Sequence, residues 1–69
     1  MEELKLRDEF IKLGQAMKAA GIVSSGIDAK MLIQDGQVTV NGEVETRRGK
    51  KLYDGDVFEF EGDEFKVVK

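Results

Sequence analysis

The sequence predicts an α+β fold, in which two short helices pack on a small antiparallel sheet. Two observations point to this class. Apolar residues recur at helical spacing between residues 13 and 34, and they alternate with polar residues in short runs between residues 37 and 68. A block of helices followed by a block of strands is typical of α+β proteins. Because 69 residues can bury only one hydrophobic core, we expect a single domain over residues 1–69.

The first two elements are expected to be a short strand and a helix. Residues 2–6 alternate weakly, so Leu4 and Leu6 would share one face of a strand. The spacing changes after Phe10. Apolar residues then fall at i, i+3, i+4 and i+7 on one face of a helix, at Leu13, Ala16, Met17 and Ala20. Gly21 provides a C-terminal stop for this helix.

A second helix is expected at residues 27–34. Ser25 stands three residues before Asp28, which is the spacing of a capping box with Asp in place of the usual Glu. Helical spacing of apolar residues continues at Ala29, Leu32 and Ile33. Gly36 ends the helix.

The rest of the chain is expected to form antiparallel strands at residues 37–40, 43–46, 57–60 and 65–68. Asn41-Gly42 is the strongest two-residue hairpin signal, because both positions of a type I′ turn need a positive φ. A later hairpin is expected to turn at Glu61-Gly62-Asp63. These patterns predict one core made of Leu13, Met17, Leu32, Ile33, Val38, Val40 and Phe58, with Met31, Phe60 and Phe65 also inside it.

The composition excludes several kinds of active site. The chain has no Cys and no His, which rules out disulfides, thiolate metal sites and imidazole catalysts. The acidic cluster of residues 54–64 lacks the calcium-loop pattern, so we interpret it as a solvated face. We therefore expect no enzyme, no catalytic residue, no metal and no cofactor.

The sequence also gives no sign of membrane insertion. Its longest apolar run is three residues, as in Met31-Leu32-Ile33, whereas a membrane-spanning helix needs about 20. The charged segment Met1–Asp8 has no apolar signal-peptide core. We expect a cytoplasmic protein without a membrane partner.

Charge is distributed unevenly along the chain. The formal net charge is −3, yet residues 12–51 carry seven basic and four acidic side chains. Acidic residues outnumber basic ones on both sides of this segment. A basic patch on an acidic body indicates oriented rather than indiscriminate binding of a polyanion.

The densest basic stretch is Thr46–Lys51, where four cations occur without an acid: Arg47, Arg48, Lys50 and Lys51. If this stretch is a loop, its cations would project together toward phosphates. Gly49 would let the backbone approach a ligand closely. The alternative is a solvated charged loop with no ligand.

Several spaced motifs follow one another along the chain. They are the Gly-x-x-x-Ser turn at Gly21–Ser25, the pair Leu32-Ile33, the run Gly36-Gln37-Val38-Thr39-Val40-Asn41-Gly42, and the late Leu52 and Gly55-Asp56-Val57. Together they resemble the RNA-binding domain named after ribosomal protein S-four, the alpha-L motif, with a motif core at residues 13–60. The stretch Asn41–Leu52 is further similar to small stand-alone bacterial members of that family.

The resemblance implies one RNA face formed by the helix pair and the following hairpin. It would place Lys18 and Lys30 on that face, and Ser25 and Gly26 would offer a hydroxyl and N–H groups to a phosphate. A plain solvent-facing role remains open for Lys30, and simple helix capping for Ser25. Many family members carry Arg directly after the inter-helix Ser. This chain has Ser25 or Gly26 there, so one typical basic contact is missing.

These observations predict an RNA-binding module that contacts structured RNA, ribosomal or transfer RNA by resemblance, in ribosome assembly. The alternative is a protein-interaction adaptor of the same fold without RNA contact. Contacts with ribosomal proteins and the oligomeric state are left open. Tyr53 is the one aromatic residue beside the basic stretch; packing at a strand end is the expected role, and base stacking is the alternative.

Overall fold

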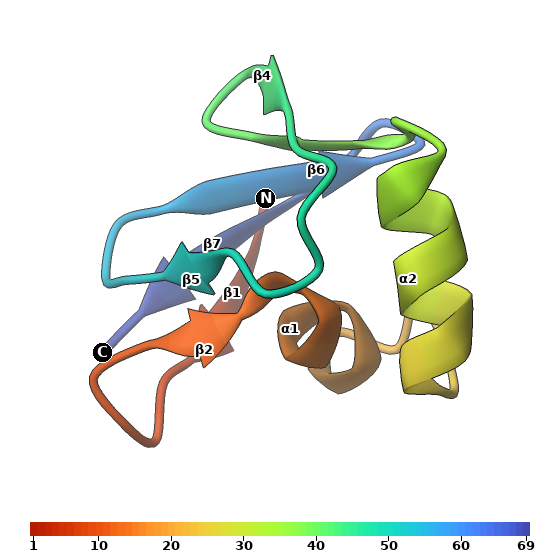
Figure 1. Cartoon of the computed structure of the whole chain (residues 1–69). Coiled ribbons are helices and arrows are strands. Elements are labelled where there is room, and N and C mark those ends of the chain that lie inside the picture. Colours follow the sequence, from red (N-terminus) through yellow and green to blue (C-terminus); the bar gives the residue numbers. More distant parts are fainter.

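The computed structural model describes all 69 residues as two helices, a five-stranded sheet and a separate two-stranded sheet (Figure 1). The elements are β1 Glu2–Lys5, β2 Ile11–Lys12, α1 Leu13–Ala19, α2 Gly26–Gln34, β3 Val38–Val40, β4 Glu43–Val44, β5 Lys51–Leu52, β6 Val57–Phe60 and β7 Asp63–Val68. The large sheet has the strand order β1-β7-β6-β3-β4, and β2 pairs with β5. The predicted α+β class is confirmed. Neither helix has the length and apolar character needed to cross a bilayer.

The large sheet is mixed rather than wholly antiparallel. β3 pairs with β4 and β6, and β6 pairs with β7, all antiparallel as expected. β1 instead lies parallel to β7, with Leu4 opposite Val67. The expectation of a purely antiparallel sheet is wrong at this edge, because alternation within a strand says nothing about the direction of its neighbour.

Both hairpins turn through residues with positive φ. The φ angles are 52° at Asn41 and 86° at Gly42, and 51° at Glu61 and 83° at Gly62. The type I′ turn expected at Asn41-Gly42 is thereby confirmed. The returning strand β4 is shorter than expected and ends at Val44, although the Glu45 N–H still donates to the Val38 carbonyl of β3 at 3.0 Å.

Both helices pack against the sheet over a core of twelve buried residues: Leu6, Leu13, Ala16, Met17, Ala29, Ile33, Val38, Val40, Leu52, Phe58, Phe65 and Val67. The predicted core is confirmed except at three positions. Leu32 and Phe60 are only partly buried, and the Met31 side chain is 65% exposed. Ala29 and Ile33 define the buried stripe of α2, so Met31, halfway between them in sequence, points to the other side of the helix.

Two members of the acidic cluster accept hydrogen bonds from other parts of the chain. The Asp56 carboxylate accepts hydrogen bonds from the Tyr53 N–H at 2.8 Å and from Asn41 Nδ2 at 3.1 Å. Asp54 Oδ1 accepts from the Lys69 N–H at 2.9 Å. Asp54 is nevertheless exposed and Asp56 is half-buried, so both carboxylates remain in contact with solvent while they have a structural role that the sequence did not reveal.

The pairing of β2 with β5 was not expected from the sequence. Each strand has two residues, with Ile11 opposite Leu52 and Lys12 opposite Lys51. This pair brings the basic stretch, which follows β4, back to the beginning of α1 (Figure 1).

Candidate nucleic-acid interface

The basic stretch is tied to the first turn of α1 by its backbone. The N–H of Leu13 donates to the Lys50 carbonyl at 2.8 Å, and the N–H of Gly14 donates to the Arg48 carbonyl at 3.1 Å. The first N–H groups of a helix have no acceptor within the helix. The loop carbonyls fill that role here, which holds the loop cations beside α1.

One hollow lies between the loop and the two helices. We call it the basic hollow; its volume is about 340 Å³, and it is lined by Lys12, Gly14, Gln15, Lys18, Gly26, Arg48 and Gly49. Three of these residues are cations, and none is apolar. Such a lining suits an anion, because it offers positive charge and hydrogen-bond donors but no surface for an apolar group.

A second hollow lies on the other side of the loop. This loop hollow has a volume of about 520 Å³ and is lined by Arg47, Gly49, Lys50, Lys51 and Tyr53. Gly49 lines both hollows, and a Cβ added at this residue would meet no atom within 4 Å. The loop cations are therefore divided between two adjacent hollows, with Arg48 on one side and the other three on the other side.

Arg47 is not a free cation. Its Nε and Nη2 atoms donate to the two carboxylate oxygens of Glu45 at 2.9 and 3.1 Å, and its N–H also donates to Glu45 Oε2 at 3.1 Å. The Glu45 side chain is 13% exposed. The side-chain hydrogen bonds from Arg47 outweigh partial burial and lower the pKa of Glu45 from 4.5 to about 2. The expectation that all four loop cations project together without an acid is wrong for Arg47.

The other cations around the two hollows have no carboxylate within 4.0 Å, since the pair of Arg47 and Glu45 is the only ion pair in the chain. Two of them oppose each other, because Lys12 and Lys51 are cross-strand partners in β2 and β5. Like charges in this position destabilise a sheet. A protein with net charge −3 thus concentrates unpaired positive charge where its own acids do not neutralise it.

The residues predicted on the helices have different positions. Lys18 and Gly26 line the basic hollow, as an RNA face would require. Ser25 Oγ accepts a hydrogen bond from the Asp28 N–H at 3.2 Å, so its hydroxyl caps α2. Lys30 lines neither hollow; it follows Gly26 by four residues and therefore lies one turn further along the same stripe of α2.

Three residues of the basic hollow were not identified from the sequence: Lys12, Gly14 and Gln15. Gln15 Oε1 accepts a hydrogen bond from the Lys12 N–H at 3.3 Å and so supports the start of α1. The available signal was weak. A glycine inside a helical pattern is unfavourable by itself and indicates that something packs closely on it.

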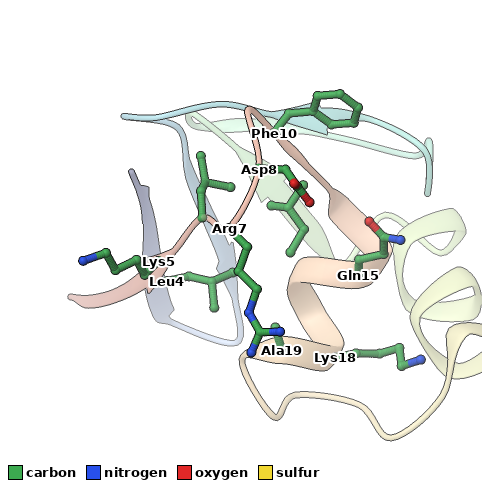
Figure 2. A pocket seen from close by; sticks show the side chains of 10 residues that line it. Leu4, Lys5, Arg7, Asp8, Phe10, Gln15, Lys18 and Ala19 are labelled. Carbon is green, nitrogen blue, oxygen red and sulfur yellow. The ribbon is translucent and has the colours of Figure 1, made fainter.

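A third hollow extends the surface along the other side of α1. Figure 2 shows it between the N-terminal segment, which contributes Leu4, Arg7 and Phe10, and α1, which contributes Lys18 and Ala19. Its volume is about 500 Å³, and half of its lining is apolar. Gln15 and Lys18 line both this hollow and the basic hollow, so they form the boundary between the two.

Known proteins match this chain in sequence and in fold. The family model of the S4 domain matches residues 4–68. The chain is 46% identical over 66 residues to the Bacillus subtilis (strain 168) protein named "Probable ribosome maturation protein RlbA", covering 94% of this chain and 93% of that protein. It is 40% identical over 58 residues to YbcJ of Escherichia coli (strain K12), named as a candidate RNA-binding protein, covering 84% of this chain and 83% of that protein.

A solved structure has the same fold. The solution structure of YbcJ from E. coli, described as revealing an alpha-L motif involved in RNA binding, superimposes with a TM-score of 0.75. The sequences are 36% identical, and the match covers 100% of this chain and 89% of that chain. The resemblance inferred from the spaced motifs is confirmed by these matches.

Proposed function

Because the chain belongs to the S4 domain family, we propose that it binds structured RNA through the basic hollow and the loop hollow. The observation that carries this proposal is the set of cations without carboxylate partners around the loop that joins β4 to β5. Phosphate is the ligand for which such a set is suited. The proposed role is binding and not catalysis.

The lining of the basic hollow favours recognition of the RNA backbone. Arg48 has a planar guanidinium that can hold a phosphate by two hydrogen bonds, and Lys12 and Lys18 add point charges beside it. Gly26 begins α2 and lines the same hollow, and its N–H has no acceptor within that helix. These contacts would read the shape of a folded RNA and the path of its phosphates, with little dependence on base identity.

The name of the Bacillus subtilis relative suggests the biological setting. That protein is named for ribosome maturation. By analogy we propose that this chain acts in the cytoplasm on ribosomal RNA during assembly of the ribosome, with transfer RNA as the other candidate target. Lys30 would extend the contact along α2, one turn beyond the basic hollow.

A protein-interaction adaptor is the second candidate, and one observation favours it. Ile27 and Met31 are 70% and 65% exposed, and they stand four residues apart on α2. Apolar side chains in such positions can contribute to a protein interface. Binding through them would depend little on salt, which separates the two candidates.

The decisive experiment is a pair of titrations against ribosomal RNA at low and moderate salt. For phosphate binding, log affinity should fall with log salt with a slope of about −0.7 to −0.9 per contacted phosphate. Replacing Lys18 and Arg48 with Ala should weaken binding and flatten this slope. The control variant, with Glu61 and Asp63 replaced by Ala, should bind as well as the parent or slightly better.

If the Lys18/Arg48 variant remains folded and keeps the affinity and salt slope of the parent, the proposed RNA surface is wrong. If the parent does not bind ribosomal RNA even at low salt, the adaptor is favoured.

A further inference from the structure

Tyr53 presents an aromatic ring at the edge of the loop hollow. The side chain is 45% exposed, although it follows the buried Leu52 at the end of β5. Its ring lies 5.8 Å from the Phe10 ring, centroid to centroid, at an interplanar angle of 50°. Packing at a strand end, the role expected from the sequence, thus accounts for only part of the ring, and the remainder is open to solvent.

The backbone holds this ring in a defined place. The Tyr53 N–H donates to Asp56 Oδ2 at 2.8 Å, and the Tyr53 carbonyl accepts from the Asp56 N–H at 3.0 Å. Phe10 in turn lies under a cation, since Lys51 Nζ is 4.8 Å from the centroid of its ring. A ring fixed by a turn and supported by a second ring loses little conformational entropy when it binds a flat ligand.

Tyr53 shares its hollow with positive charge. Arg47, Lys50 and Lys51 line the loop hollow with it, and only Arg47 has a carboxylate partner. A nucleotide with an unpaired base combines a flat ring and an anion a few ångströms apart. Aromatic rings beside a positively charged groove are the usual platform for unstacked bases of single-stranded RNA.

We propose that Tyr53 stacks on an unpaired nucleobase whose phosphate is held by Lys50 and Lys51, next to the structured RNA in the basic hollow. This inference rests on the proposed function and adds a class of substrate to it, namely RNA in which a single-stranded segment adjoins a paired one. Gly49, which lines both hollows, marks the place where the paired and unpaired parts would meet.

The test uses two RNA hairpins with the same paired stem. One is fully paired to its end, and the other carries a single-stranded extension of about four nucleotides, the lower limit of a typical single-strand site. Both are labelled for fluorescence anisotropy and titrated with the parent protein, with Tyr53→Leu and with Tyr53→Phe. Thermal unfolding of each variant is measured first, and the Phe variant keeps an aromatic ring in the same place.

The parent should bind the extended hairpin more tightly than the paired one by about fivefold to a hundredfold, the range expected for stacking of one to a few bases. Tyr53→Phe should keep this preference, and Tyr53→Leu should bind the two hairpins with equal affinity. NMR supplies a second readout, because Tyr53 is the only tyrosine and there is no tryptophan. Its ring proton signals should shift upfield with the extended hairpin only.

Two results would overturn the inference in different ways. If Tyr53→Leu keeps the preference, or if the parent has none, the stacking site is wrong and the phosphate-binding surface is unaffected. If the parent binds neither hairpin, the proposed function fails, and the stacking site fails with it.

Discussion

Arg48 occupies the space that a side chain on residue 14 would need. A Cβ added at Gly14 would lie 2.7 Å from Arg48 Cγ and 3.3 Å from Arg48 Cδ. The two residues are also joined through their backbones, since the Gly14 N–H donates to the Arg48 carbonyl. Gly14 therefore determines the direction in which the Arg48 side chain leaves the loop and enters the basic hollow.

Gly14→Ala is expected to lower RNA affinity while it changes the stability of the fold little. Alanine favours a helix by about 1 kcal/mol over glycine, which offsets part of the cost of moving a flexible arginine. We expect the urea midpoint to change little, while RNA affinity falls because Arg48 must leave its position. Gly21→Ala is no suitable control, because Gly21 has a φ of 78°, and neither is Gly49→Ala, because Gly49 lines both hollows. The control is the Arg48→Ala variant, in which adding Gly14→Ala should not lower RNA affinity further. Equal RNA affinity of Gly14→Ala and the parent would contradict this prediction.

Arg47 and Arg48 are expected to differ in their effect on binding, although they are neighbours. The Arg47 guanidinium is held by Glu45, so its charge is partly compensated before RNA arrives, whereas Arg48 has no acidic partner. Arg48→Ala should therefore weaken binding more than Arg47→Ala, and should reduce the salt slope by about one. Anisotropy titrations at three salt concentrations measure both quantities. If Arg47→Ala and Arg48→Ala lose equal RNA affinity, the prediction is wrong, and the ion pair of Arg47 and Glu45 opens freely when RNA binds.

Glu45 is expected to make stability depend on pH in the acid range. Its pKa is about 2 in the folded protein and 4.5 without its partners, because Arg47 donates hydrogen bonds to it. A lowered folded pKa gives a contribution that is present above pH 4.5 and is lost as the pH falls toward 2. In urea titrations at several pH values, the parent should lose its advantage over Glu45→Gln within that window. The parent should lose its advantage over Arg47→Ala in the same window, because Arg47 is the cause of the lowered pKa. An advantage over Glu45→Gln that persists at pH 2 would contradict the assignment.

Much of the fold followed from local signals. Ser25 caps α2, Asn41-Gly42 turns the first hairpin, and Ile33 lies in the core, because each of these roles depends on residues within a few positions. The direction of β1 and the pairing of β2 with β5 depend on segments about 40 to 60 residues apart. Hydrophobic periodicity is a local signal and does not predict which distant segments pair.

The candidate site was predictable to a similar extent. The basic stretch and Lys18 were identified from composition and resemblance, and Lys18 lies in the hollow. Lys12 was missed because only the β2–β5 pair brings it next to Lys51. The ion pair of Arg47 with Glu45 was missed because Glu45 was assigned to a strand. Residues two positions apart in a strand share a face, but this spacing does not by itself predict an ion pair.

Two neighbouring residues of α2 are expected to differ in their contribution to stability. Ile33 is fully buried against the sheet, whereas Leu32 is only partly buried. Ile33→Ala should lower the free energy of unfolding by about 2–5 kcal/mol, as is usual for a large core residue, and Leu32→Ala should cost clearly less. Urea unfolding followed by circular dichroism gives both values. A larger loss for Leu32→Ala would mean that the orientation of α2 is wrong.

Lys12 is expected to lower stability while it raises RNA affinity. It faces Lys51 directly across the β2–β5 pair, and neither lysine has an acid within 4.0 Å. Opposed like charges cost on the order of 0.2–1 kcal/mol in a sheet, so Lys12→Gln should raise the free energy of unfolding by a few tenths of a kcal/mol. The same change removes one cation from the basic hollow, so binding should weaken and the salt slope should shrink by about 0.7–0.9 if Lys12 contacts one phosphate.

Lys66→Gln on β7, outside the described hollows, is the control and should leave both the free energy of unfolding and the RNA affinity near the parent values. If the Lys12→Gln variant gains stability but keeps the RNA affinity of the parent, Lys12 is not part of the RNA interface.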